Sequence, residues 1–213
     1  PLELEARLIR LVRMGAISDV QSVLASVKQE NFENRKIAGA TLNELLTELR
    51  GTIHRIAAQI YRDDAERAHA TRTRLERLDK EPLAPGMLDH LAAVLVDFCG
   101  ESQERLRSHN RRLRDEALEF LGKEYVRSDL NLYLVASHFG LTEKYFSQFF
   151  KEQTGENFSL YLERVRMEKA RELLAESDTP VKDVAVSVGY QNVNTFYKAF
   201  RRFSGVSPRA FRD

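Results

Sequence analysis

Two stretches of the chain, LYLVASHFGLTEKYFSQFFKEQTG (residues 132–155) and VKDVAVSVGYQNVNTFYKAFRRFSG (residues 181–205), are copies of one pattern. Each copy has an alanine four positions before a glycine: Ala136 with Gly140, and Ala185 with Gly189. The small alanine lets a second helix approach closely, and the glycine adopts the left-handed backbone of a tight turn without steric cost. The repeat therefore predicts two helix-turn-helix units.

An aromatic pair follows each turn, at the i, i+4 spacing that places two side chains on one face of a helix. The pairs are Phe146 with Phe150 and Phe196 with Phe200, and each is followed by a basic residue, Lys151 or Arg201. We expect these phenylalanines to hold the second helix of each unit against its core. The second copy carries one extra residue in its turn.

The stretch that joins the copies, residues 158–174, has apolar residues at helical spacing and predicts one connecting helix. Thr179 and Pro180 then fit the N-cap and the first residue of the next helix. Two units joined in this way are a far more specific signal than one unit alone.

Residues from about 112 to 213 resemble the DNA-binding domain of the AraC/XylS family. The resemblance rests on FKEQTGENFSLYLERVRMEKARELL (150–174), DVAVSVGYQNVNTFYKAF (183–200) and GVSPRAFR (205–212). It implies two small helical subdomains linked by one long helix. It also implies two recognition helices that enter successive major grooves, which lie roughly 34 Å apart on one face of DNA.

The same resemblance implies which residues face base edges. The first recognition helix is expected to begin near Thr142 and the second near Asn192. Lysine can reach guanine acceptors, and glutamine or asparagine can pair with both hydrogen-bonding groups of adenine. The matching positions are Lys144, Ser147 and Gln148 in the first helix, and Val193, Asn194, Thr195, Tyr197 and Lys198 in the second, where Asn194 and Lys198 are the strongest base-reading candidates.

Other side chains of this half are expected to contact phosphates or to support the fold. Tyr145 is expected to face inward at least in part, with Phe146 and Phe149, and Tyr197 either stacks on a sugar or supports its helix. Phosphate contacts fix the register but carry no sequence information. The candidates are Lys151, Arg201, Arg202, Arg209 and Arg212, and simple solvation is an equal alternative for each one. Arg212 and Glu168 also fit a structural role that ties helices together.

The N-terminal half also indicates helices, so the predicted fold class is all-α: a helical domain over residues 1–110 and the paired helix-turn-helix domain over 111–213. Apolar residues recur at helical spacing up to Gly15, from an N-cap at Ser18, and over residues 37–61, where Gly51 could introduce a break. NFENRKIAGATLNELLTELRGTI (31–53) resembles the helical segment that precedes the DNA-binding domain in large, often membrane-anchored sensor-regulators of the family. Such a bundle could relay a signal, form a homodimer or bind a small ligand, and the sequence leaves these three roles open.

Two polar stretches have competing interpretations. Residues 62–80 are rich in arginine, but acidic residues alternate with the arginines, which favours a solvated helix anchored by Leu75 and Leu78 over a nucleic-acid arm. Residues 87–98 predict a compact apolar helix. Residues 100–114 then predict a connecting helix, or a short dimer seam through Leu106 and Leu113.

Composition excludes several classes of protein. The net charge of +1 gives no sign of nucleic-acid binding, and acidic and basic residues nearly balance in both halves. The single cysteine, Cys99, excludes a disulfide framework and fits a buried apolar position. None of the five histidines lies three or four residues from another, and no glycine-rich phosphate loop occurs, so we expect neither an enzyme nor a cofactor or metal site.

The sequence thus predicts a DNA-binding transcription regulator, an activator in preference to a repressor, whose partners are double-stranded promoter DNA and RNA polymerase. No apolar run is long enough to span a membrane, and the single cysteine favours a reducing compartment. We therefore expect the chain in the cytoplasm, on its own or as the cytoplasmic part of a membrane-anchored protein. The chain begins at Pro1 rather than at methionine, which fits a piece of a longer protein with an upstream sensor. The alternative is a helical interaction or signal-relay module with weak DNA affinity in isolation.

Overall fold

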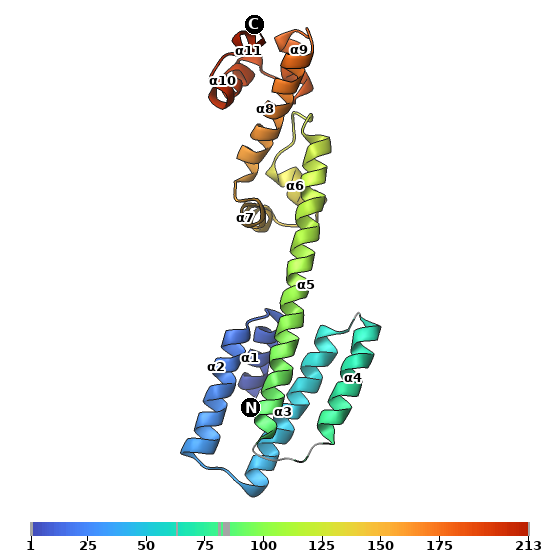
Figure 1. Cartoon of the computed structure of the whole chain (residues 1–213), viewed down its shortest axis with the longest axis vertical. Coiled ribbons are helices and arrows are strands. Elements are labelled where there is room, and N and C mark those ends of the chain that lie inside the picture. The colour runs from blue at the N-terminus through green and yellow to red at the C-terminus, as the bar shows by residue number, and fades with distance from the viewer. Residues whose placement is uncertain (1, 63, 81, 83–85, 213) are drawn as a thin grey trace. The chain divides into compact units, whose positions relative to one another are not determined.

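A computed structural model describes residues 2–62, 64–80, 82 and 86–212 of the chain. Within these residues all regular structure is helical, which confirms the predicted all-α class (Figure 1). The chain divides into two compact units, residues 1–108 and 109–213. Helix α5 (Met87–Glu124) contributes its first part to one unit and its last part to the other.

The N-terminal unit contains four helices before α5. They are α1 (Leu2–Arg13), α2 (Ile17–Lys28), α3 (Gly39–Ile60) and α4 (Ala65–Asp79), with one turn of π-helix, η1 (Gln29–Asn34), after α2. Helix α1 packs against α2 and α3, and α4 packs against α3. Their apolar faces meet in one core around the fully buried Leu46, Ile53 and Phe98. The helical spacing of the apolar residues therefore predicts this core correctly.

The turn between α1 and α2 depends on Gly15, as the sequence predicts. Its φ is +68°, and a Cβ there would lie 2.8 Å from Cβ of Gln103. The predicted N-cap at Ser18 is wrong, because the cap position is Ala16, two residues earlier, and α2 begins at Ile17. The chain reverses at the left-handed Gly15. The carbonyl oxygen of the next residue, Ala16, therefore already accepts the first helical hydrogen bond, from the amide of Val20 at 3.0 Å.

Two glycines lie inside helices where the sequence allows a break. Helix α3 continues through Gly51, and α5 continues through Gly100, so the separate helix over 87–98 is a wrong prediction. A helical glycine costs only about 1 kcal/mol relative to alanine. Buried neighbours outweigh that cost: Thr52 and Ile53 follow Gly51, and Phe98 and Cys99 precede Gly100.

Of the remaining predictions for this half, those for α4 and Cys99 are confirmed and the leucine seam is wrong. Leu75 and Leu78 anchor α4 in the core, and Asp64 caps the helix by accepting the amide of Arg67 at 3.0 Å, which confirms the solvated-helix interpretation. Cys99 is fully buried, and burial raises the pKa of its thiol to about 11. Leu113 is buried in the core of the C-terminal unit whereas Leu106 is exposed, so the two leucines do not form the predicted seam.

The C-terminal unit contains the end of α5 and six further helices: α6 (Leu132–His138), α7 (Glu143–Thr154), α8 (Phe158–Glu176), α9 (Val181–Ser187), α10 (Val193–Ser204) and α11 (Pro208–Arg212). Two cores meet at α8, which gives its first half to one and its second half to the other. The predicted connecting helix is therefore confirmed.

The phenylalanine pairs lie at the centres of these two cores. Phe146 and Phe150 are buried in the first core, with ring centroids 5.7 Å apart. Phe196 and Phe200 repeat the arrangement in the second, again at 5.7 Å. Both pairs hold the second helix of their unit against the core, as predicted.

The start of α9 differs from the prediction. Pro180 occupies the cap position and the helix begins at Val181, so Thr179 is not the N-cap. Pro180 itself has a non-helical ψ of 139°, and its carbonyl oxygen accepts the first helical hydrogen bond, from the amide of Val184 at 3.0 Å. The carbonyl oxygen of Thr179 accepts a hydrogen bond from Nη2 of Arg212 at 2.5 Å, so Arg212 ties α11 to the start of α9.

Candidate DNA-binding surface

Helices α7 and α10 have the same length and the same kind of cap at each end. Each has 12 residues and an N-cap side chain that accepts the amide three residues on: Thr142 from Tyr145 at 3.3 Å, and Asn192 from Thr195 at 3.1 Å. Each ends at a left-handed glycine, Gly155 or Gly205. Both predicted caps are confirmed, and because the ends are equivalent, every position along α7 has a partner in α10.

The two turns that precede these helices are also alike. Gly140 has φ +66° and Gly189 has φ +85°, the left-handed backbone that the repeat predicts. In each turn the residue after the glycine donates its amide to the carbonyl oxygen of the buried alanine, Ala136 or Ala185, at 2.9 Å. The second turn is one residue longer because Gln191 precedes its cap.

Helix α7 exposes most of its predicted base-reading side chains. Lys144 and Gln148 are exposed, and Ser147 is half-buried. Nε2 of Gln148 donates to a carboxylate oxygen of Glu152, one turn on, at 2.9 Å, which uses one of the two N–H groups of this amide. Tyr145 is 49% exposed, which places it at the surface more than the sequence suggests.

Helix α10 presents the corresponding positions. Asn194, Thr195 and Lys198 are exposed, while Val193 and Tyr197 are half-buried. The ring of Tyr197 lies edge-on to Phe196, with centroids 6.3 Å apart. In the shared register Asn194 corresponds to Lys144 and Lys198 to Gln148. Both helices thus carry polar, hydrogen-bonding side chains at their second and sixth positions.

The basic candidates fall into two groups. Lys151, Arg201 and Arg209 are exposed, and none has an ion-pair partner among the residues that the structure describes. Arg202 instead donates to both carboxylate oxygens of Glu163 on α8, at 2.7 and 2.6 Å, and this bond raises the pKa of its guanidinium. The phosphate candidates that remain without an internal partner are therefore Lys151, Arg201 and Arg209.

A joint that the sequence does not predict connects the two helix-turn-helix units. Arg166 of α8 donates from Nε to the carbonyl oxygen of Tyr125 at 2.9 Å, and from Nη2 to that of Arg127 at 2.6 Å. Its guanidinium also lies 5.6 Å from the ring centre of Tyr190, and burial lowers its pKa. The only sequence signal was an arginine between the apolar residues 165 and 167.

Gly189 lies at the centre of this joint. A Cβ there would come within 2.7 Å of the carbonyl oxygen of Tyr125 and 2.9 Å of Nη2 of Arg166, so the second turn fits only as glycine. Nε2 of Gln191, the extra residue of this turn, donates to Oγ of Ser128 at 2.8 Å. The segment after α5 and the second turn are thus in direct contact.

The described residues hold neither a clustered metal site nor a membrane-spanning helix. They contain no group of three or more histidine, cysteine, aspartate or glutamate residues that could hold a metal ion. No helix among them is both long enough and apolar enough to cross a bilayer.

Comparison with known proteins agrees with this geometry. A family model described as a helix-turn-helix domain matches residues 135–213, which include both turns. The regulatory protein PocR of Salmonella typhimurium is 39% identical over 89 residues, which are 42% of this chain and 29% of PocR. The transcriptional activator RhaS of Escherichia coli is 36% identical over 91 residues, which are 43% of this chain and 33% of RhaS. The chain therefore spans about a third of the length of these relatives.

Among solved structures, the C-terminal domain of AraT, a response regulator from Geobacillus stearothermophilus, is 35% identical, with a TM-score of 0.46. The match covers 47% of this chain and 83% of that domain. The matched family model and the relatives PocR and RhaS agree with the sequence repeat. Residues 135–213 of this chain are a helix-turn-helix domain of the AraC type.

Proposed function

We propose that the chain regulates transcription by binding double-stranded DNA through α7 and α10, one helix in each of two successive major grooves. The observation that carries this proposal is the equivalence of the two helices. They share their length, their N-cap geometry, their terminal glycine and their exposed polar positions. A major groove admits one α-helix, with residues near its N-terminal end contacting base edges.

The base contacts are proposed for the exposed face of each helix. Lys144 is suited to the O6 and N7 acceptors of guanine, and Gln148 and Asn194 to the N6 and N7 groups of adenine. The full proposed set is Lys144, Ser147 and Gln148 on α7, and Asn194, Thr195 and Lys198 on α10.

Phosphate contacts are proposed for Lys151 and Arg201, which occupy equivalent positions in the last turns of α7 and α10, and for Arg209 on α11. Each phosphate neutralised by such a cation adds about 0.9 to the slope of log affinity against log salt. A chain with net charge +1 needs this local placement, because it has no excess of positive charge to attract DNA from a distance.

We infer further that the regulator is an activator that contacts RNA polymerase in the cytoplasm, since RhaS is named a transcriptional activator. The N-terminal unit then couples a signal to the DNA-binding unit, as a homodimer contact, a relay from an upstream sensor or a ligand site. Its resemblance to the helical segment of larger sensor-regulators supports this role.

The decisive experiment is selection of binding sites from a random duplex pool, followed by titration of the selected duplex by fluorescence anisotropy at 50 and 200 mM salt. The proposal expects two short conserved blocks centred roughly one helical turn apart. It also expects affinity to fall steeply as salt rises. No selected sequence and no salt-dependent binding would instead support a relay module with little DNA affinity of its own.

A further inference from the structure

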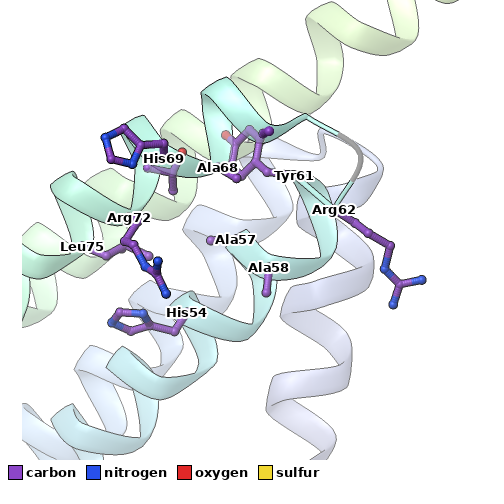
Figure 2. A pocket seen from close by; sticks show the side chains of 11 residues that line it. His54, Ala57, Ala58, Tyr61, Arg62, Ala68, His69, Arg72 and Leu75 are labelled. Atoms are coloured by element: carbon purple, nitrogen blue, oxygen red, sulfur yellow. The ribbon is translucent and has the colours of Figure 1, made fainter.

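A groove of about 550 Å³ lies between α3 and α4 in the N-terminal unit (Figure 2). Alanines from both helices, among them Ala57, Ala58 and Ala68, line it together with the buried Leu75. Larger side chains at these positions would fill the space. Its volume falls in the range of about 300–1,000 Å³ that sites for small molecules occupy.

The ionisable side chains along this groove, apart from Tyr61, are all basic. They are His54, Arg62, His69 and Arg72, and no aspartate or glutamate of the described residues lines the groove. The chain as a whole has almost equal numbers of acidic and basic residues, so this segregation is a local property. The site is therefore complementary to negative charge.

The four basic side chains extend in different directions (Figure 2). Figure 2 shows Arg72 of α4 extending towards His54 of α3, whereas Arg62 and His69 extend away from the groove. Arg72 has no hydrogen bond or ion pair with any residue that the structure describes. The carboxylate of Asp79 contacts two other basic side chains: it lies 3.0 Å from Nε2 of His54 and 3.8 Å from Nε of Arg50. Arg72 thus remains available to an external anion.

We propose that the groove between α3 and α4 binds a small organic acid. Its carboxylate pairs with Arg72, and its apolar body packs against the alanines that line the groove, which we call the alanine floor. A guanidinium group matches a carboxylate because two parallel hydrogen bonds can form between them. The alanine floor selects acids with a hydrocarbon or aromatic body over small inorganic anions. This site is independent of the proposed DNA contacts, which lie in the other unit.

The test compares two probes of the same shape, 1-naphthoate and the neutral 1-naphthamide, each titrated into the full chain and followed by amide NMR shifts. The proposal expects naphthoate to shift amides of residues 54–75 and to bind at least about tenfold more tightly than naphthamide, because only naphthoate can form the charge-assisted pair. Equal affinities, shifts confined to other residues, or no binding of naphthoate at millimolar concentration would overturn it.

Three variants complete the test. Arg72→Gln should weaken naphthoate binding about tenfold and leave naphthamide binding unchanged. Arg77→Gln is the matched control, because it removes the same charge from an exposed position of α4 that does not line the groove. Ala58→Phe, at an exposed position of the lining, should block both probes by filling the space. Equal losses in Arg72→Gln and Arg77→Gln, with native circular dichroism, would overturn the assignment of Arg72.

Discussion

Arg166 and Tyr125 join the two helix-turn-helix units, through a hydrogen bond of 2.9 Å from the guanidinium Nε to the backbone carbonyl oxygen. Tyr125 lies just after α5, beside the first unit, and Arg166 lies at the middle of α8. The second turn closes over this bond with Gly189, whose missing side chain leaves room for both groups. The relative placement of α7 and α10 therefore depends on three elements that meet at one point.

The two turn glycines should respond differently to the same substitution. Both have positive φ, so an alanine at either position costs about 1–2 kcal/mol of backbone strain. A Cβ at Gly140 meets nothing within 4 Å, whereas at Gly189 it would lie 2.7 Å from a backbone oxygen. We expect Gly189→Ala to lower the free energy of unfolding, measured by urea denaturation, by at least about 1 kcal/mol more than Gly140→Ala. Equal losses of unfolding free energy in the two variants would show that the contacts around Gly189 rearrange to accept a Cβ at no energetic cost.

Removing an aromatic ring from either core should have a large effect on stability. Phe150 and Phe200 are at most 1% exposed, and truncation of a buried phenylalanine costs about 3–5 kcal/mol. We expect Phe150→Ala and Phe200→Ala each to lose this amount in urea denaturation. Tyr133→Ala is the control, since this side chain is 60% exposed, and its loss should stay within about 0.5 kcal/mol. A loss below 1 kcal/mol for either phenylalanine would contradict the packing described.

Substitutions of base-reading and of phosphate-binding side chains should have different effects on the binding of selected DNA: the first change sequence discrimination, and the second change overall affinity and its salt dependence. Gln148→Ala and Asn194→Ala should each reduce discrimination against a changed base pair by about 1–3 kcal/mol. Lys151→Ala should weaken binding to all sequences alike and reduce the salt slope by about 0.9. The measurement is anisotropy titration of the selected duplex and single-base variants. Unchanged discrimination in both Gln148→Ala and Asn194→Ala would remove these residues from the proposed base contacts.

The bond between Arg202 and Glu163 should limit the affinity for DNA. Glu163→Gln removes the carboxylate charge and releases the α10 guanidinium, which is 67% exposed, to a phosphate. We expect tighter binding at low salt and a salt slope steeper by up to about 0.9. Glu168→Gln provides the control, because it makes the same charge change on α8 at a carboxylate that pairs with Arg164, at 3.1 Å, and not with Arg202. If both variants bind alike, net charge rather than Arg202 explains the change.

The features that sequence could predict are those determined by neighbours along the chain. The caps Thr142 and Asn192, the left-handed Gly140 and Gly189, and the phenylalanine pairs follow from helix geometry alone. Arg166 was missed because its partner, Tyr125, is 41 residues away and accepts through its backbone, which leaves no trace in side-chain type.

The errors have a related cause. The sequence predicts a helix boundary near Gly100 because the cost of glycine is visible in it, whereas the packing of Phe98 and Cys99 that outweighs this cost is not. The groove between α3 and α4 also depends on which helices become neighbours. In the sequence, the alanines at positions 57, 58 and 68 fit a solvated face or a closely packed one equally well. Only the packing of α4 against α3 shows that they line a groove.

Loss of the joint should relax the spacing that the chain requires between its two DNA half-sites. One inserted base pair turns the second half-site by roughly 36° and moves it by about 3.4 Å, so a rigid pair of helices loses one set of base contacts, worth about 1–3 kcal/mol. We expect wild-type affinity to fall about tenfold or more on a one-base-pair insertion. Arg166→Gln should reduce that penalty while keeping most of the affinity for each half-site alone. Lys169→Gln, at an exposed position of α8 where the ammonium group donates to Glu172 at 2.7 Å, should behave as wild type. An unchanged penalty in Arg166→Gln would mean that α8 alone holds the two units in register.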